Sequence, residues 1–159
     1  MKKSSDPIAQ LMQEHNEALV HLKLLNKASL AFSHYGYGRK HYLQIVSSLK
    51  FIEKEVTEHN RKEEQALFPI LERYIEGPTR IMRSDHKKLR IGFERLRQCV
   101  TVVNKNRDSF SAIKKLTGVS KTVVQLFVNH IHKENYILFP LVQKFLSKDE
   151  LREVAKKML

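Results

Sequence analysis

The feature that most restricts the fold of this chain is a segment that occurs twice, 71 residues apart. The first copy, HNRKEEQALFP, begins at His59, and the second, HIHKENYILFP, begins at His130. The copies share His, Lys, Glu, Leu, Phe and Pro at matching positions. The same offset relates His15 to His86, and an acidic residue precedes each of these histidines. The sequence therefore predicts two similar halves, each with a histidine upstream of a His-x-x-x-Glu pair.

Apolar residues recur every three or four positions along most of the chain, which is typical of amphipathic helices. Breaks in this pattern predict four long helices, at about 6–32, 39–69, 79–104 and 109–145. Gly118 is a candidate interruption of the fourth. Ser147 followed by Glu150 forms a capping box that predicts a tail helix over about 147–158. With no strand-like alternation, we expect an all-α fold: a single domain over 1–159 that comprises an up-down-up-down four-helix bundle at about 6–145 and the short C-terminal helix.

The spacing of the repeated residues places them together in such a bundle. In each half, the two histidines lie about equally far from the turn between their helices, so at about 1.5 Å per residue all four fall in one cross-section. Each glutamate follows a histidine by four residues and shares its helix face. These faces coincide with the apolar stripes, so the side chains should point into the core. The predicted set is His15, His59, Glu63, His86, His130 and Glu134.

Two carboxylates buried among imidazoles predict a metal site, because each unpaired charge would otherwise cost several kcal/mol. The only cysteine is Cys99, so an internal disulfide and a thiolate cluster are excluded. Six nitrogen and oxygen donors suit iron or manganese better than a structural zinc site. If both carboxylates bridge, the set fits two iron ions with an oxo or hydroxo bridge and open positions for an outside ligand. We expect iron in preference to manganese.

The array of four histidines and two glutamates, with Leu-Phe-Pro after each glutamate, resembles the hemerythrin-like (HHE cation-binding) family over about 6–145. This resemblance implies a four-helix bundle with a non-haem di-iron centre whose ligands are the six residues named above. Arg90 stands where oxygen-carrying hemerythrins have a fifth histidine, and Asn135 where they have an acid. The pattern is therefore closer to the iron-sensing and iron-centre-repair members. Well-known repair proteins carry a further N-terminal domain with cysteine, so we do not expect complete repair function here.

Other residues receive more ordinary interpretations. The Leu-Phe-Pro segments are expected to be packing residues and helix terminators. For Glu55 and Tyr136, a position beside the ligands and a position in solvent are both open. The four remaining histidines do not share the ligand stripes.

Charge and hydropathy limit the kinds of binding partner that we expect for this chain. The net charge is +12, but the basic residues are scattered along the chain, which favours solvated helix faces over a nucleic-acid-binding surface. Apolar runs are far shorter than the roughly 20 residues that cross a bilayer, and the start of the chain lacks the apolar stretch of a secretion signal. We therefore expect a cytoplasmic protein without a membrane partner.

The predicted open metal positions favour one function. We expect a non-haem di-iron protein that binds or reduces a small oxidant (oxygen, peroxide or nitric oxide) in sensing or stress response; if it is an enzyme, it is a di-iron oxidoreductase. The alternative is an iron-responsive or iron-donating module in iron homeostasis or iron-sulfur centre repair, without turnover of its own. A purely structural or anion-binding bundle is the third possibility.

Overall fold

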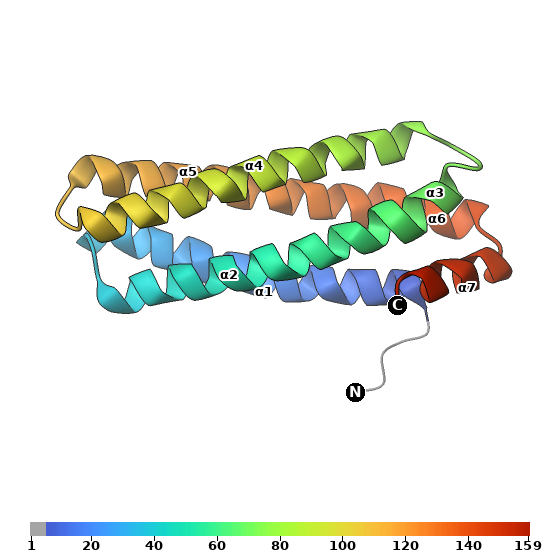
Figure 1. Cartoon of the computed structure of the whole chain (residues 1–159), viewed down its shortest axis with the longest axis horizontal. Helices are drawn as coiled ribbons and strands as arrows, with labels where there is room; N and C mark the ends of the chain where they lie inside the picture. The colour runs from blue at the N-terminus through green and yellow to red at the C-terminus, as the bar shows by residue number, and fades with distance from the viewer. Residues whose placement is uncertain (1–5) are drawn as a thin grey trace.

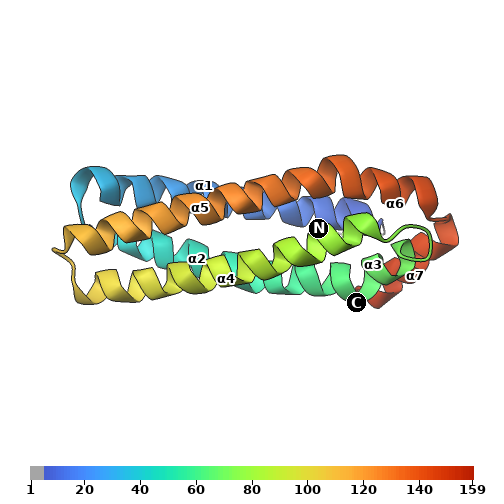
Figure 2. The same cartoon turned by 90° about the horizontal axis from the view of Figure 1, so that it is seen from above.

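A computed structural model describes residues 6–159, which fold into an antiparallel four-helix bundle (Figures 1 and 2). The helical elements in chain order are α1 (Pro7–Tyr35), α2 (Arg39–Lys62), the π-helix η1 (Glu63–Leu67), α3 (Phe68–Leu71), α4 (Gly77–Lys105), α5 (Phe110–Lys133), the π-helix η2 (Glu134–Leu138), α6 (Phe139–Phe145) and α7 (Lys148–Lys157). No strand is present in this part of the chain. The predicted fold class is confirmed. Residues 1–5 of the predicted domain lie outside the described residues.

The ends of the helices follow local capping chemistry. Asp6 begins α1, and its side chain accepts a hydrogen bond from the Ile8 amide at 2.9 Å. Gly36 ends α1 with φ of 78°, a conformation that glycine adopts without strain, so α1 runs three residues further than predicted. Ser147 and Glu150 form both hydrogen bonds of the capping box, which confirms the start of α7.

Two features of the helices differ from expectation. Gly118 does not interrupt α5, because a single glycine costs only about 1 kcal/mol in a helix whose other side chains are packed. Pro69 and Pro140 do not terminate their helices either, since each is followed by further α-helix. Instead, each is preceded by a π-helical segment. A proline cannot donate to the carbonyl four residues earlier and its ring would clash with that carbonyl, which explains why the backbone widens in the preceding turn.

The apolar core forms two clusters, one on each side of the predicted ligand level. The larger fills the end of the bundle near the α1–α2 and α4–α5 turns and includes Leu22, Ile52 and Phe127. The smaller includes Leu67 and Val154, so α7 closes the opposite end of the core. The polar residues between them are therefore held at a fixed depth in the bundle.

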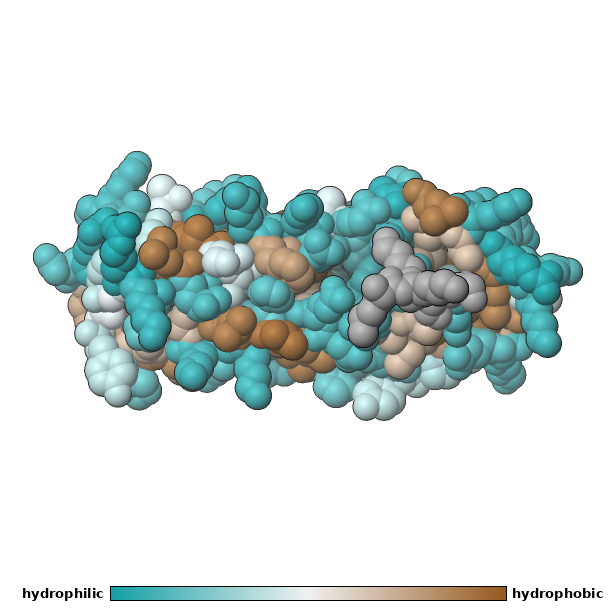
Figure 3. Space-filling view, turned by 90° about the horizontal axis from the view of Figure 1, so that it is seen from below, coloured by the Kyte–Doolittle hydropathy of each residue, from teal (hydrophilic) through white to brown (hydrophobic). Residues whose placement is uncertain are grey.

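None of the helices over residues 6–159 combines the length and hydropathy required to span a bilayer. The face of the molecule in Figure 3 is mainly hydrophilic, with separated apolar patches.

Gly92 marks a close approach of α4 to α5. A Cβ atom at this position would lie 2.9 Å from Cγ2 of Val123, which is too close for two carbon atoms. Although alanine normally stabilises a helix interior by about 1 kcal/mol relative to glycine, we expect Gly92→Ala to lower the free energy of unfolding by about 1–2 kcal/mol. Urea unfolding followed by circular dichroism measures this. Gly118→Ala is the matched control, because nothing lies within 4 Å of its added Cβ; stabilisation of both variants would contradict the predicted clash.

Candidate metal centre

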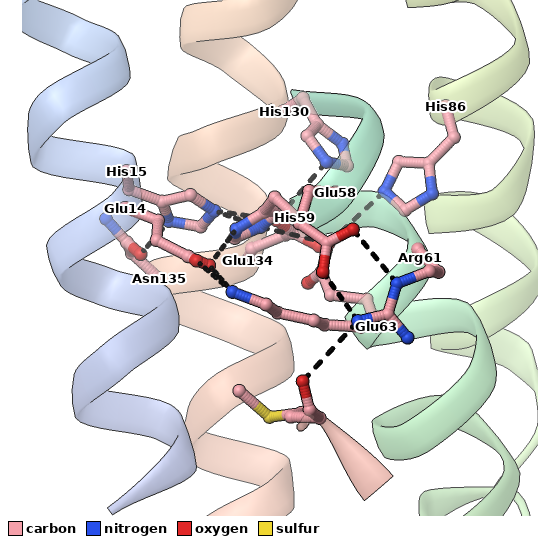
Figure 4. A network of polar contacts seen from close by, with 12 residues as sticks. Glu14, His15, Glu58, His59, Arg61, Glu63, His86, His130, Glu134 and Asn135 are labelled. Atoms are coloured by element: carbon pink, nitrogen blue, oxygen red, sulfur yellow. Dashed lines mark hydrogen bonds and ion pairs between the residues drawn. The ribbon is translucent and has the colours of Figure 1, made fainter. Parts of the chain in front are cut away.

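The structure brings all six predicted ligand side chains together in the core (Figure 4). They come from the four rods of the bundle, which are α1, α2 continued by η1, α4, and α5 continued by η2. Each of the six residues is at most 7% exposed. Both glutamates occupy the first position of a π-helical segment, one turn after a histidine of the preceding α-helix. The site residues are His15 on α1, His59 on α2, Glu63 on η1, His86 on α4, His130 on α5 and Glu134 on η2.

Glu63 lies between histidines of both halves. Its Oε1 is 3.1 Å from Nε2 of His59 and 3.3 Å from Nε2 of His86. Donors bound at about 2.1 Å to one metal ion are separated by about 3 Å when they are neighbours in its coordination shell. The observed separations therefore fit common ligands of a cation.

Glu134 occupies the equivalent position in the second half. Its Oε1 lies 2.9 Å from Nε2 of His15 and 3.2 Å from Nε2 of His130. The Nε2 atoms of His15 and His59 are 3.1 Å apart. Both carboxylates thus contact a histidine from each half, and all six donor groups face one small volume.

Several buried polar atoms of this group lack a hydrogen-bond partner among the described residues. They include both carboxylate oxygens of Glu63, Oε2 of Glu134, and the Nε2 atoms of His86 and His130. Leaving such atoms unsatisfied in an apolar core costs about 1–3 kcal/mol each, and more where a charge is involved. A cation among these atoms would satisfy them together, so the donor set fits a metal site.

Electrostatic interactions between the imidazoles and carboxylates shift their pKa values. Burial lowers the pKa of His130, but the nearby negative charge of Glu134 and the hydrogen bond to Asp85 outweigh it and raise that pKa to about 9. Burial likewise opposes protonation of His59, yet the neighbouring carboxylates, Glu63 first, hold its pKa well above the usual value. Burial raises the pKa of Glu134, but the charge of His130 and hydrogen bonds hold it well below the usual value. Protons compensate the carboxylates when no cation does, and a bound metal must displace them.

The acidic residue that precedes the first histidine of each half lies beside the histidine of the next long helix. Asp85 accepts a hydrogen bond from Nδ1 of His130 at 3.0 Å and forms an ion pair with Nζ of Lys133 at 2.5 Å. Burial raises the pKa of Asp85, but these two partners outweigh it and lower that pKa. Glu14 holds the equivalent position with a weaker contact: its carboxylate is 2.9 Å from Nζ of Lys62, but it lies 3.6 Å from Nδ1 of His59, which is too far for a hydrogen bond.

The remaining two ligand histidines are held by the residue that follows each glutamate. Nδ1 of His86 donates to Glu64 at 2.8 Å, and Nδ1 of His15 donates to Oδ1 of Asn135, also at 2.8 Å. Such bonds fix the tautomer and turn Nε2 towards a metal. The two halves therefore differ in charge, because a carboxylate supports His86 where a neutral amide supports His15.

The contacts of Glu14, Asp85, Glu64 and Asn135 with the histidines were not predicted from the sequence, although the repeat contained a signal for them. The 71-residue offset that relates the ligands also relates Glu14 to Asp85, Lys62 to Lys133 and Glu64 to Asn135. Their contacts depend on how the rods are arranged, which the offset alone does not show.

Tyr136 and Glu55 lie outside the ligand set, whereas the phenylalanines of the Leu-Phe-Pro segments lie against it. Tyr136 is 73% exposed and stacks on His132, so it points away from the ligands, and Glu55 is partly exposed on α2. The repeated phenylalanines do contact the site: Phe139 stacks on His15 with ring centroids 5.5 Å apart, and Phe68 on His86 at 5.9 Å. They pack, as predicted, and the surfaces against which they pack are the rings of two predicted ligands.

We expect Asp85→Asn to weaken metal binding by about 10- to 100-fold, because it removes the charged acceptor that orients His130 while keeping the shape of the side chain. Competition with a coloured chelator measures the affinity. Glu94→Gln is the control, since Glu94 is exposed on the same helix and pairs with Arg97. Equal affinities for Asp85→Asn and the unmodified protein would show that this hydrogen bond does not support the site.

The fold and the site together define a class: four-helix-bundle proteins with a buried, metal-binding set of histidines and glutamates. The chain belongs to the hemerythrin HHE cation binding domain family, whose model matches residues 6–142. It is 32% identical over 101 residues to the iron-sulfur cluster repair protein YtfE of Yersinia pseudotuberculosis serotype IB (strain PB1/+), and 31% identical over 101 residues to YtfE of Yersinia pestis (strain Pestoides F). Each match covers 60% of this chain but 45% of the relative, so the matched region is less than half of those proteins.

Proposed function

We propose that this protein binds two iron ions at the six-residue centre and supplies iron for the repair of damaged iron-sulfur clusters. The observation that carries the proposal is the convergence of four histidines and two glutamates, several of whose buried donor atoms lack a hydrogen-bond partner among residues 6–159. The relatives named for iron-sulfur cluster repair direct it towards iron supply.

The geometry supports two metal positions. One would be held by His15 and His59, the other by His86 and His130, with Glu63 and Glu134 between them, since each carboxylate lies within 3.3 Å of a histidine of both pairs. An oxo or hydroxo group could complete the bridge. Imidazole and carboxylate donors without thiolate suit iron. When bound, iron would supply redox and Lewis-acid chemistry at this level of the bundle.

The outer residues support a role in which iron is held and released. Glu14 and Asp85 are each paired with a lysine, and Asp85, Glu64 and Asn135 each accept a hydrogen bond from a predicted ligand histidine, so these three histidines do not depend on the metal alone for their orientation. A site that keeps its shape when a metal leaves can be loaded again. The difference between Glu64 and Asn135 also makes the two positions unequal, and we expect iron beside the neutral amide of Asn135 to be released first.

An iron-transfer assay tests the proposal. Iron-loaded protein is mixed with an iron-sulfur enzyme inactivated by loss of cluster iron, and recovery of its activity is compared with loss of iron from the donor. Recovery should require the loaded protein and should fail with the His59→Ala, His130→Ala double variant. If the protein carries two irons per chain but no activity returns and no iron leaves, the repair function is wrong. Metal analysis after expression distinguishes iron from manganese.

A second function, binding or reduction of a small oxidant, is favoured by one observation. A cleft of about 450 Å³ opens between α2 and α4 and reaches His86, so a small molecule has a route towards the site. Nitric oxide, oxygen and peroxide are added in turn to the reduced iron-loaded protein, and its optical spectrum is recorded. A change with one of them would support this function, whereas unchanged spectra with all three would exclude it.

A further inference from the structure

The cleft between α2 and α4 carries a charge pattern that the metal centre does not explain. α2 and α4 run side by side at the front of the bundle in Figure 1. The α4 side presents His86, Arg90, Phe93 and Arg97, which recur every three or four residues and so lie on one helix face. The α2 side adds Arg61. Buried His86 forms the inner wall, while Arg90 and Arg97 are exposed towards the outside.

The three arginines differ in their partners. Arg61 donates to Glu58 at 2.6 Å and 3.0 Å. Arg97 pairs with Glu53 across the cleft at 3.2 Å. Arg90 makes no hydrogen bond or ion pair with any residue in the described range 6–159. It is therefore a free cation, one helical turn beyond His86.

The carboxylates of the cleft are already occupied. Glu53 is paired with Arg97, and Glu64 accepts from Nδ1 of His86. Glu53 is partly buried, and this burial raises its pKa despite the opposing charge of Arg97. Neutral hydrogen-bonding groups from Thr57, Asn60 and Gln65 complete the lining. An incoming anion thus meets one free guanidinium and several polar side chains.

We propose that this cleft binds a small multivalent oxyanion, carboxylate- or phosphate-bearing, with Arg90 as its anchor. A planar guanidinium binds either group through two parallel hydrogen bonds. A volume of about 450 Å³ suits a compact metabolite-sized compound. The bound anion would lie against the His86 side of the metal centre, so it could reach that side without replacing any of the six predicted ligands.

Calorimetric titration tests this inference. Purified protein at low salt is titrated with tricarballylate, a tricarboxylate that chelates iron only weakly, and separately with inorganic phosphate. We expect at least one of them to bind, with affinity about tenfold weaker in Arg90→Gln. Arg95→Gln is the matched control, because Arg95 is exposed on the same helix but faces away from the cleft. Binding of tricarballylate assigns the carboxylate class, and binding of phosphate alone assigns the phosphate class.

Two outcomes would overturn the inference: neither anion binds, or Arg90→Gln and Arg95→Gln weaken binding equally, as a general effect of net charge would. Iron content is measured on the same samples. Anion binding that depends on Arg90 in protein that takes up no added iron would keep the cleft assignment while contradicting the proposed iron function. Iron-loaded protein that binds neither anion would do the reverse.

Discussion

Substitution of Glu134 by glutamine should abolish tight binding at both metal positions. One oxygen of this side chain lies 2.9 Å from the donor nitrogen of His15 and 3.2 Å from that of His130, so it serves ligands of both positions. The amide keeps the shape but loses the charge that a cation would neutralise. Removing one partner of a buried charge pair costs about 3–5 kcal/mol, which corresponds to a fall in affinity of at least about 100-fold. Iron content after purification and chelator competition both measure this loss.

The control for this variant must change charge without touching the site. Glu58→Gln satisfies that condition, because Glu58 is an exposed residue of α2 whose partner is Arg61. It should retain the metal content of the unmodified protein. Full metal occupancy in Glu134→Gln would show that Glu134 is not a ligand and would require a different assignment of the centre.

Removal of the metal should lower the thermal stability of the bundle by at least about 8 °C. A ligand present at 1,000 times its dissociation constant stabilises the folded state by about 4 kcal/mol, and each kcal/mol corresponds to about 2–4 °C in a chain of this size. The fold should nevertheless persist, because protons on His59 and His130 partly compensate the carboxylates and two apolar clusters flank the site. Thermal unfolding followed by circular dichroism, with and without chelator, measures the difference.

Two comparisons make this result specific. Restoring iron to the chelated protein should recover the original midpoint, and the chelator should have little effect on Glu134→Gln. A midpoint that is unchanged by complete iron removal would show that the six residues contribute nothing to stability through a metal, and the predicted coupling between binding and folding would be wrong.

The 71-residue repeat predicted more of the fold and of the site than the amino-acid composition did. Because a helix advances by a constant rise, the spacing from His15 to His59 already specifies that they meet in an antiparallel hairpin. The start of the tail helix at Ser147 could also be predicted, because a capping box depends only on residues that are close in the sequence. Charge was less informative: the +12 net charge suggested only solvated surfaces, whereas the structure shows that Arg61 and Arg97 are paired and that Arg90 has no polar partner among residues 6–159.

What the sequence determined by itself is the all-α class, the level at which the histidines and glutamates meet, and the two-fold character of the site, because all of these depend on spacing along helices. The tertiary structure decided the rest: the outer bonds of Asp85, Glu64 and Asn135, and the cleft between α2 and α4. These features depend on which helices are neighbours and on how closely they pack. Sequence spacing specifies only the position of a residue along the helix axis. A contact between two helices also depends on the rotation of each helix about its axis and on the distance between the axes, and only the tertiary structure fixes these.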